Sequence, residues 1–72
     1  MNREEDLQKI LNLKVGGTAY VNWFEEGGGE VLKCDNYYIL YVIPRYGGEG
    51  WCYGDFPLGE EEAVLDVAYS WN

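Results

Sequence analysis

Carboxylates are the most abundant side chains of this sequence that are able to do acid–base chemistry, since it contains thirteen Asp and Glu and no His. Without an imidazole there is no His base, no Cys–His pair and no His-ligated metal site. Hydroxyl nucleophiles are scarce, because Thr18 and Ser70 are the only Thr and Ser. Two carboxylates could act as a glycosidase acid and base, but that needs a deep cleft, which a 72-residue chain seldom has. We therefore expect a protein that is not an enzyme.

Patterns for metal and phosphate sites are also missing. The two cysteines, Cys34 and Cys52, are too few for a structural zinc site, which needs about four ligands. No run has the alternating acids around a glycine that calcium loops use. The glycine runs Gly27-Gly28-Gly29 and Gly47-Gly48 lack the Lys-Ser/Thr of a phosphate loop, so we expect both to be ordinary turns. We expect no cofactor, and cysteines that are reduced, half-buried thiols.

The charge of the chain is strongly negative, at −8 with thirteen acids against five bases. This disfavours direct binding to nucleic acid or to an anionic membrane, and it favours a protein partner with a basic surface. The alternative is that the acids only keep an aromatic-rich chain soluble. The polar first residues hold no secretion signal, and no apolar run reaches the length of a membrane span. A cytoplasmic protein is therefore expected.

Hydrophobic spacing and turn signals predict one α+β domain over residues 1–72, with a four-stranded antiparallel sheet flanked by an N-terminal and a C-terminal helix (α-β-β-β-β-α). Asn2 is the expected N-cap of the first helix, and Leu7, Ile10 and Leu11 its core-facing stripe. The expected helices run from Asn2 to Asn12 or Leu13 and from about Glu60 to Trp71. The expected strands are Thr18–Phe24, Val31–Cys34, Tyr37–Ile43 and Trp51–Phe56.

The strand Tyr37–Ile43 is apolar on both sides. Alternation sends Tyr38, Leu40 and Val42 to one face of the sheet, and Tyr37, Ile39, Tyr41 and Ile43 to the other. One helix on each face would make the strand simply part of the core. If both helices cover the same face, the other face presents tyrosines, which are enriched in binding hot spots. That second arrangement implies a homodimer or a partner site.

The acids gather at positions expected to lie on the surface. Glu25, Glu26 and Glu30 surround a hairpin turn, Glu49 and Asp55 flank a later loop and strand, and Glu60 to Glu62 open the last helix. If these groups approach one another, carboxylates on a rigid domain imitate a row of phosphates and fit a basic nucleic-acid channel. Three separate solvated patches are the alternative.

The run Tyr46-Gly47-Gly48-Glu49, a short strand, and then Glu60-Glu61-Glu62-Ala63 leading to Ala68-Tyr69-Ser70-Trp71 resembles small acidic accessory proteins of phages and mobile elements. Some of these are anti-CRISPR inhibitors that block a Cas effector. The resemblance covers the C-terminal third and implies an inhibitor acting in the cytoplasm of a bacterial host. It carries over no functional residue.

Two hypotheses follow. The first is a stoichiometric inhibitor, an acidic DNA mimic, that binds a basic nucleic-acid-binding surface of a host defence effector of the CRISPR–Cas or restriction type. Its charge would come from Glu25, Glu26, Glu30, Glu49 and Asp55, and its anchors from Tyr37, Tyr41, Tyr46 and Trp51. The second is a small interaction module, a homodimer joined through the Tyr-rich sheet face.

Overall fold

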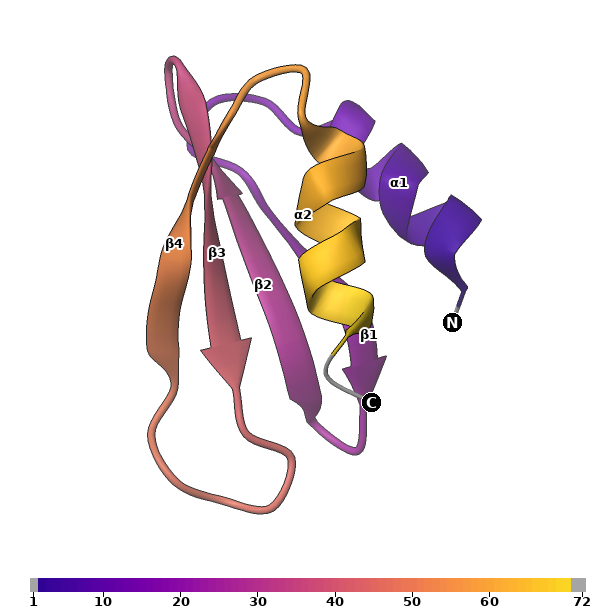
Figure 1. The fold of residues 1–72 in the computed structure, drawn as a ribbon, viewed down its shortest axis with the longest axis vertical. Coiled ribbons are helices and arrows are strands. Elements are labelled where there is room, and N and C mark those ends of the chain that lie inside the picture. The colour runs from indigo at the N-terminus through magenta and orange to yellow at the C-terminus, as the bar shows by residue number, and fades with distance from the viewer. Residues whose placement is uncertain (1, 71–72) are drawn as a thin grey trace.

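The computed structural model describes residues 2–70, which form the expected α-β-β-β-β-α sequence of elements (Figure 1). The four strands make one antiparallel sheet in the order β1-β2-β3-β4, so the predicted four-stranded antiparallel sheet is confirmed. Asn2 caps the first helix as expected, because its side chain accepts the Glu5 backbone N–H at 2.8 Å. The helices are α1 (Arg3–Leu11) and α2 (Glu61–Tyr69), and the strands are β1 (Thr18–Phe24), β2 (Gly27–Lys33), β3 (Tyr37–Ile43) and β4 (Trp51–Pro57).

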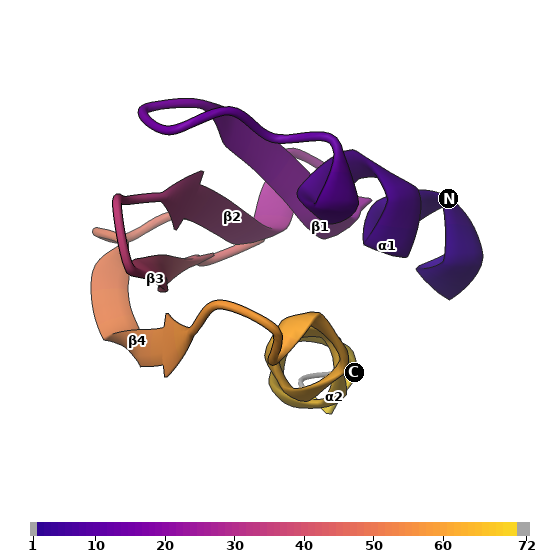
Figure 2. The same ribbon diagram turned by 90° about the horizontal axis from the view of Figure 1, so that it is seen from above.

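Both helices lie on the same side of the sheet. Seen from above, the sheet curves around α2, while α1 lies beside β1 and next to α2 (Figure 2). The fold is therefore a two-layer arrangement with one core between the layers. The buried apolar side chains of that core are Ile10, Val21, Val31, Tyr38, Leu40, Val64, Leu65 and Ala68.

A buried carboxylate ties the two helices to β1. Asp6 is 1% exposed and accepts hydrogen bonds from the Asn22 backbone N–H at 2.8 Å and the Tyr69 hydroxyl at 2.5 Å. Asn22 has a positive φ of 49° at a break in the β1–β2 register, and its side chain donates to the Ala68 carbonyl at 3.0 Å. Buried polar groups need partners, and these bonds supply them while holding α1 and α2 against the bulge.

The first glycine run is not a turn, which corrects the sequence prediction. Glu25 and Glu26 alone form the turn, and β2 begins at Gly27 instead of Val31. Crowding explains why glycine is needed inside this strand. A Cβ on Gly27 would lie 2.6 Å from the Arg45 backbone, and one on Gly28 would lie 2.4 Å from the Asn22 carbonyl oxygen. The second run, Gly47-Gly48, does lie in a loop.

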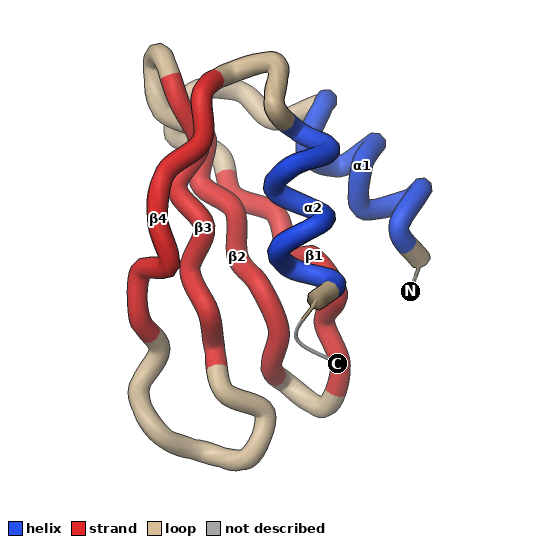
Figure 3. Tube along the Cα trace, in the orientation of Figure 1, coloured by secondary structure: helices blue, strands red, loops and turns tan. Residues whose placement is uncertain are grey.

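The two helices, which Figure 3 shows beside the sheet, need one correction to the predicted core-facing residues. Leu11 is 50% exposed, because α1 ends there and leaves the sheet, while Ile10 is buried. In α2 the buried residues are Val64, Leu65 and Ala68, and the N-cap is Glu60. The predicted end at Trp71 lies outside the described residues. Neither helix of residues 2–70 is long and apolar enough to cross a membrane.

Candidate functional site

The face of the sheet opposite the helices is the candidate site, and we call it the open face. Tyr38 and Leu40 of β3 are buried against the helices, so the alternating residues point the other way. Cross-strand partners share a face, which assigns residues of β1, β2 and β4 to it as well. The open face consists of Thr18, Tyr20, Trp23, Gly28, Glu30, Leu32, Tyr37, Ile39, Tyr41, Ile43, Cys52, Asp55 and Pro57.

This face combines apolar and aromatic groups with acids. Tyr20 is 47% exposed and Tyr37 is 40% exposed, while Leu32, Ile39, Tyr41 and Ile43 are half-buried. Its two charged residues, Glu30 and Asp55, are both acidic. A surface of this kind favours a partner that offers apolar contact together with positive charge.

The acids predicted to act together are divided among three places. Glu30 and Asp55 lie on the open face, opposite Tyr41 and Ile39 respectively. The β1–β2 turn, with Glu25 and Glu26, and the β3–β4 loop, with Glu49, lie at one end of the sheet (Figure 1). The start of α2 lies at the other end, so its three acids do not join the hairpin acids.

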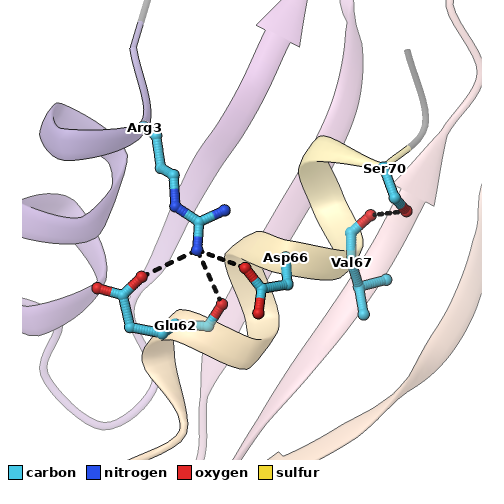
Figure 4. Close-up of polar contacts among 5 residues, drawn as sticks. All are labelled: Arg3, Glu62, Asp66, Val67 and Ser70. Carbon is cyan, nitrogen blue, oxygen red and sulfur yellow. Dashed lines mark hydrogen bonds and ion pairs between the residues drawn. The ribbon is translucent and has the colours of Figure 1, made fainter.

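The acids of α2 are instead engaged within the fold. One Arg3 amino group bonds the Glu62 carboxylate at 2.9 Å and the Asp66 carboxylate at 2.6 Å (Figure 4), and these bonds raise the pKa of Arg3. Glu61 accepts the Tyr38 hydroxyl at 2.8 Å. Partial burial raises the pKa of Glu61, but the bonds from Tyr38 and from backbone N–H groups outweigh it, so the net shift is downward. These acids therefore make contacts within the helix layer and with β3.

The hairpin acids sit in an unfavourable backbone conformation. Glu25 and Glu26 have φ of 52° and 63°, and a two-residue hairpin loop with both φ positive normally takes Asn-Gly. A non-glycine residue in this region costs roughly 1–2 kcal/mol. Two exposed carboxylates are therefore held, at some expense of stability, on the rim of the sheet next to β2.

The remaining predicted anchors lie apart from Tyr37 and Tyr41. Trp51 is the cross-strand partner of Val42. Both residues lie on the helix side of the sheet, because Val42 alternates with Tyr41 along β3. The Trp51 side chain is 54% exposed and lies outside the core. Tyr46 is 89% exposed in the β3–β4 loop. It borders a shallow hollow of about 260 Å³ with Gly28, Val42, Ile43, Pro44 and Arg45. The hollow is at the loop end of the sheet, where Glu49 also lies.

Sequence reasoning missed two aromatic residues of the open face. Tyr20 pairs with Glu30, and its ring lies 4.2 Å from that of Trp23, centroid to centroid. Strict alternation along β1 identifies Tyr20, but it places Trp23 on the helix side. The bulge at Asn22 shifts the parity and brings Trp23 back beside Tyr20. No signal in the sequence marks that bulge.

The cysteines are free thiols in different settings. Cys34 is half-buried as expected, whereas Cys52 is exposed, which corrects the expectation that both are half-buried. Cys34 bonds to Tyr37 in the β2–β3 turn, whereas Cys52 pairs with Tyr41, four residues further along β3. That offset alone is about 13 Å along the strand, beyond the ~7 Å Cα separation that a disulfide spans. A hydrogen bond with Cys34, together with Asp55 and Asp35 nearby, raises the pKa of Tyr37.

Among residues 2–70, no three His, Cys, Asp or Glu side chains are grouped closely enough to hold a metal ion. Comparisons of this chain with protein-family models, with curated proteins and with solved structures find no match.

Proposed function

We propose that this chain is a protein-binding domain that acts without catalysis, and that its open face binds a partner with a basic surface. The observation that carries the proposal is the composition of that face. Aromatic and aliphatic side chains cover it, and its charged residues, Glu30 and Asp55, are both acids. Aromatic anchors supply binding energy, and complementary charge supplies orientation and a fast on-rate.

The form we propose first is an inhibitor that occupies the nucleic-acid-binding surface of a host defence effector. Such a surface is basic, and a rigid sheet that holds carboxylates in fixed positions competes with phosphates for it. The strained turn acids, Glu25 and Glu26, support this form because they extend the negative charge from the open face to the rim. Glu49 adds to it from the neighbouring loop.

A homodimer through the open face is the second candidate, favoured by the half-buried apolar pair Leu32 and Ile39 at its centre. A two-fold interface there would place Glu30 and Asp55 against the same acids of the second copy. Like charges without a counter-charge oppose association, so we rank this form second. Sedimentation at 1 mM and 10 µM protein tests it: a monomer at both concentrations excludes it.

The experiment for the first form compares two charge-reversed variants. One carries Glu30→Lys and Asp55→Lys on the open face, and the control carries Glu4→Lys and Glu60→Lys at the starts of the two helices, so the net charge is equal. Each is immobilised, exposed to nuclease-treated bacterial lysate at about 0.1 M and 0.5 M salt, and its bound proteins are quantified.

The expected partner is a nucleic-acid-binding protein that the wild type and the control retain at low salt and the open-face variant loses. The wild-type chain should then displace nucleic acid from the purified partner. A partner that both variants retain equally, or one whose nucleic-acid binding is unchanged, contradicts the proposal.

A further inference from the structure

One row across the open face places a carboxylate between two phenol rings. Glu30 of β2 is the cross-strand partner of Tyr20 on β1 and of Tyr41 on β3. Direct neighbours of this kind have Cβ atoms about 5 Å apart. No helix covers this face, yet Glu30 is half-buried, so its neighbours on the sheet supply the burial.

The cations of the chain are directed elsewhere within residues 2–70. None of the ion pairs in this part of the chain involves Glu30. Four of the five basic residues have acceptors at other places, and Lys14 lies in the α1–β1 loop. Arg3 bonds Glu62 and Asp66, Lys9 pairs with Asp6, Lys33 donates to the Leu13 carbonyl, and Arg45 donates to the Asn22 carbonyl.

A half-buried carboxylate in a central strand is an unfavourable choice for the free protein. Glutamate is depleted in strands, and partial removal of its charge from water is costly without a cation nearby. The two flanking rings change which cation fits. Aromatic faces attract cations, and a guanidinium group is planar, stacks on rings and offers two parallel N–H groups to a carboxylate. An ammonium group offers a point charge without that planar match.

We propose that Glu30, Tyr20 and Tyr41 form a subsite for one arginine side chain of the partner. The guanidinium group lies between the two rings and donates to the Glu30 carboxylate. Trp23 supports the subsite by packing on Tyr20. This inference rests on the proposed function, because it names the group by which a basic partner is recognised at the open face.

The experiment uses capped eight-residue peptides that alternate alanine with arginine, lysine or citrulline, and follows the amide and ring resonances of the labelled protein by NMR. Citrulline keeps the shape of arginine without its charge. The variant is Glu30→Gln, and the matched control is Asp55→Asn, which removes the same charge from the same face about 12 Å away, across β3. Dispersed spectra establish that both variants fold.

The arginine peptide is expected to shift the resonances of Tyr20, Glu30 and Tyr41, and the citrulline peptide is not. Glu30→Gln should weaken arginine-peptide binding about tenfold, and Asp55→Asn about twofold. Equal weakening by both substitutions, or equal affinity for the lysine peptide, overturns the subsite while leaving the basic-partner proposal in place. Shifts confined to residues away from the open face overturn the subsite and contradict the proposed function as well.

Discussion

Asn22 donates its backbone N–H to the Asp6 carboxylate at 2.8 Å, across a helix–strand contact in which both side chains are buried. The bond fixes the bulge of β1, where Asn22 takes its positive φ. Because the bulge brings Trp23 beside Tyr20, the buried polar contact on one side of the sheet positions an aromatic pair on the other. The position of the Tyr20–Trp23 pair on the open face therefore depends on the Asp6 carboxylate, which lies on the other side of the sheet.

Replacement of Asp6 by Ala should lower the free energy of unfolding by about 3 kcal/mol. The Asn22 N–H and the Tyr69 hydroxyl would both lose a buried acceptor, and leaving buried donors unsatisfied costs about 1–3 kcal/mol each. Urea unfolding followed by tryptophan fluorescence measures the change. Asp35→Ala, in an exposed turn, is the matched control and should change stability by less than about 0.5 kcal/mol. Equal stabilities of the two variants would contradict this role of Asp6.

Glycine at position 28 should be irreplaceable, whereas glycine at 47 should not. Both have positive φ, but a Cβ at Gly28 would meet the Asn22 carbonyl oxygen at 2.4 Å, and one at Gly47 would meet nothing within 4 Å. Gly28→Ala therefore combines backbone strain with overpacking, each worth about 1–3 kcal/mol. Gly47→Ala meets only the strain. Thermal unfolding by circular dichroism should show the larger loss for Gly28→Ala, and similar losses would exclude the clash as the cause.

The parts of the fold that follow local rules were predictable from the sequence. The period of two in Tyr37–Ile43 separates Tyr38 and Leu40 from Tyr41, and Asn2 before three acids marks a helix start. The predictions were wrong where contacts between residues distant in the sequence determine the local structure. Gly27 is a strand residue because of Arg45, and Asp6 is buried because Tyr69 lies against it. The placement of both helices on one face, which creates the candidate site, is a tertiary property that no local pattern encodes.

The stability of the protein should fall above pH 10 partly through Tyr38. Burial first, and then its bond to Glu61, raise the pKa of the Tyr38 hydroxyl from 10.0 to about 12. A folded-state pKa above the unfolded value means that the contribution is full below pH 10 and is lost as the pH rises through 12. Urea unfolding at pH 9 and 11 should show wild type losing about 1 kcal/mol more than Tyr38→Phe. Equal losses of unfolding free energy in wild type and in Tyr38→Phe would contradict this role of Tyr38. Tyr69 is present in both proteins, so its contribution cancels in the comparison.

The hairpin turn should become more stable when its acids are replaced. The double variant Glu25→Asn with Glu26→Gly supplies the residues that two positive φ values favour, and we expect a gain of about 1–2 kcal/mol in the free energy of unfolding. If the acids contribute to binding, the same variant should bind the partner more weakly at low salt. Replacing only Glu49 by Gln is the control, because it removes a loop charge without changing a strained position. A variant that is less stable than wild type would show that the turn is not strained.

Replacement of Glu30 by Thr should separate stability from binding. Threonine suits a central strand, and the change removes a half-buried carboxylate that forms no ion pair within residues 2–70, so unfolding should cost about 0.5 kcal/mol more. Partner affinity should fall nevertheless, because the negative charge between Tyr20 and Tyr41 on the open face is gone. The same substitution at the exposed loop residue Glu49 should leave stability unchanged. Thermal unfolding measures the stability of the variant, and titration with the partner measures its affinity. A residue that lowers the stability of the free protein and raises affinity is retained for binding. A variant that is both less stable and equally tight-binding would instead make Glu30 a structural residue of the sheet.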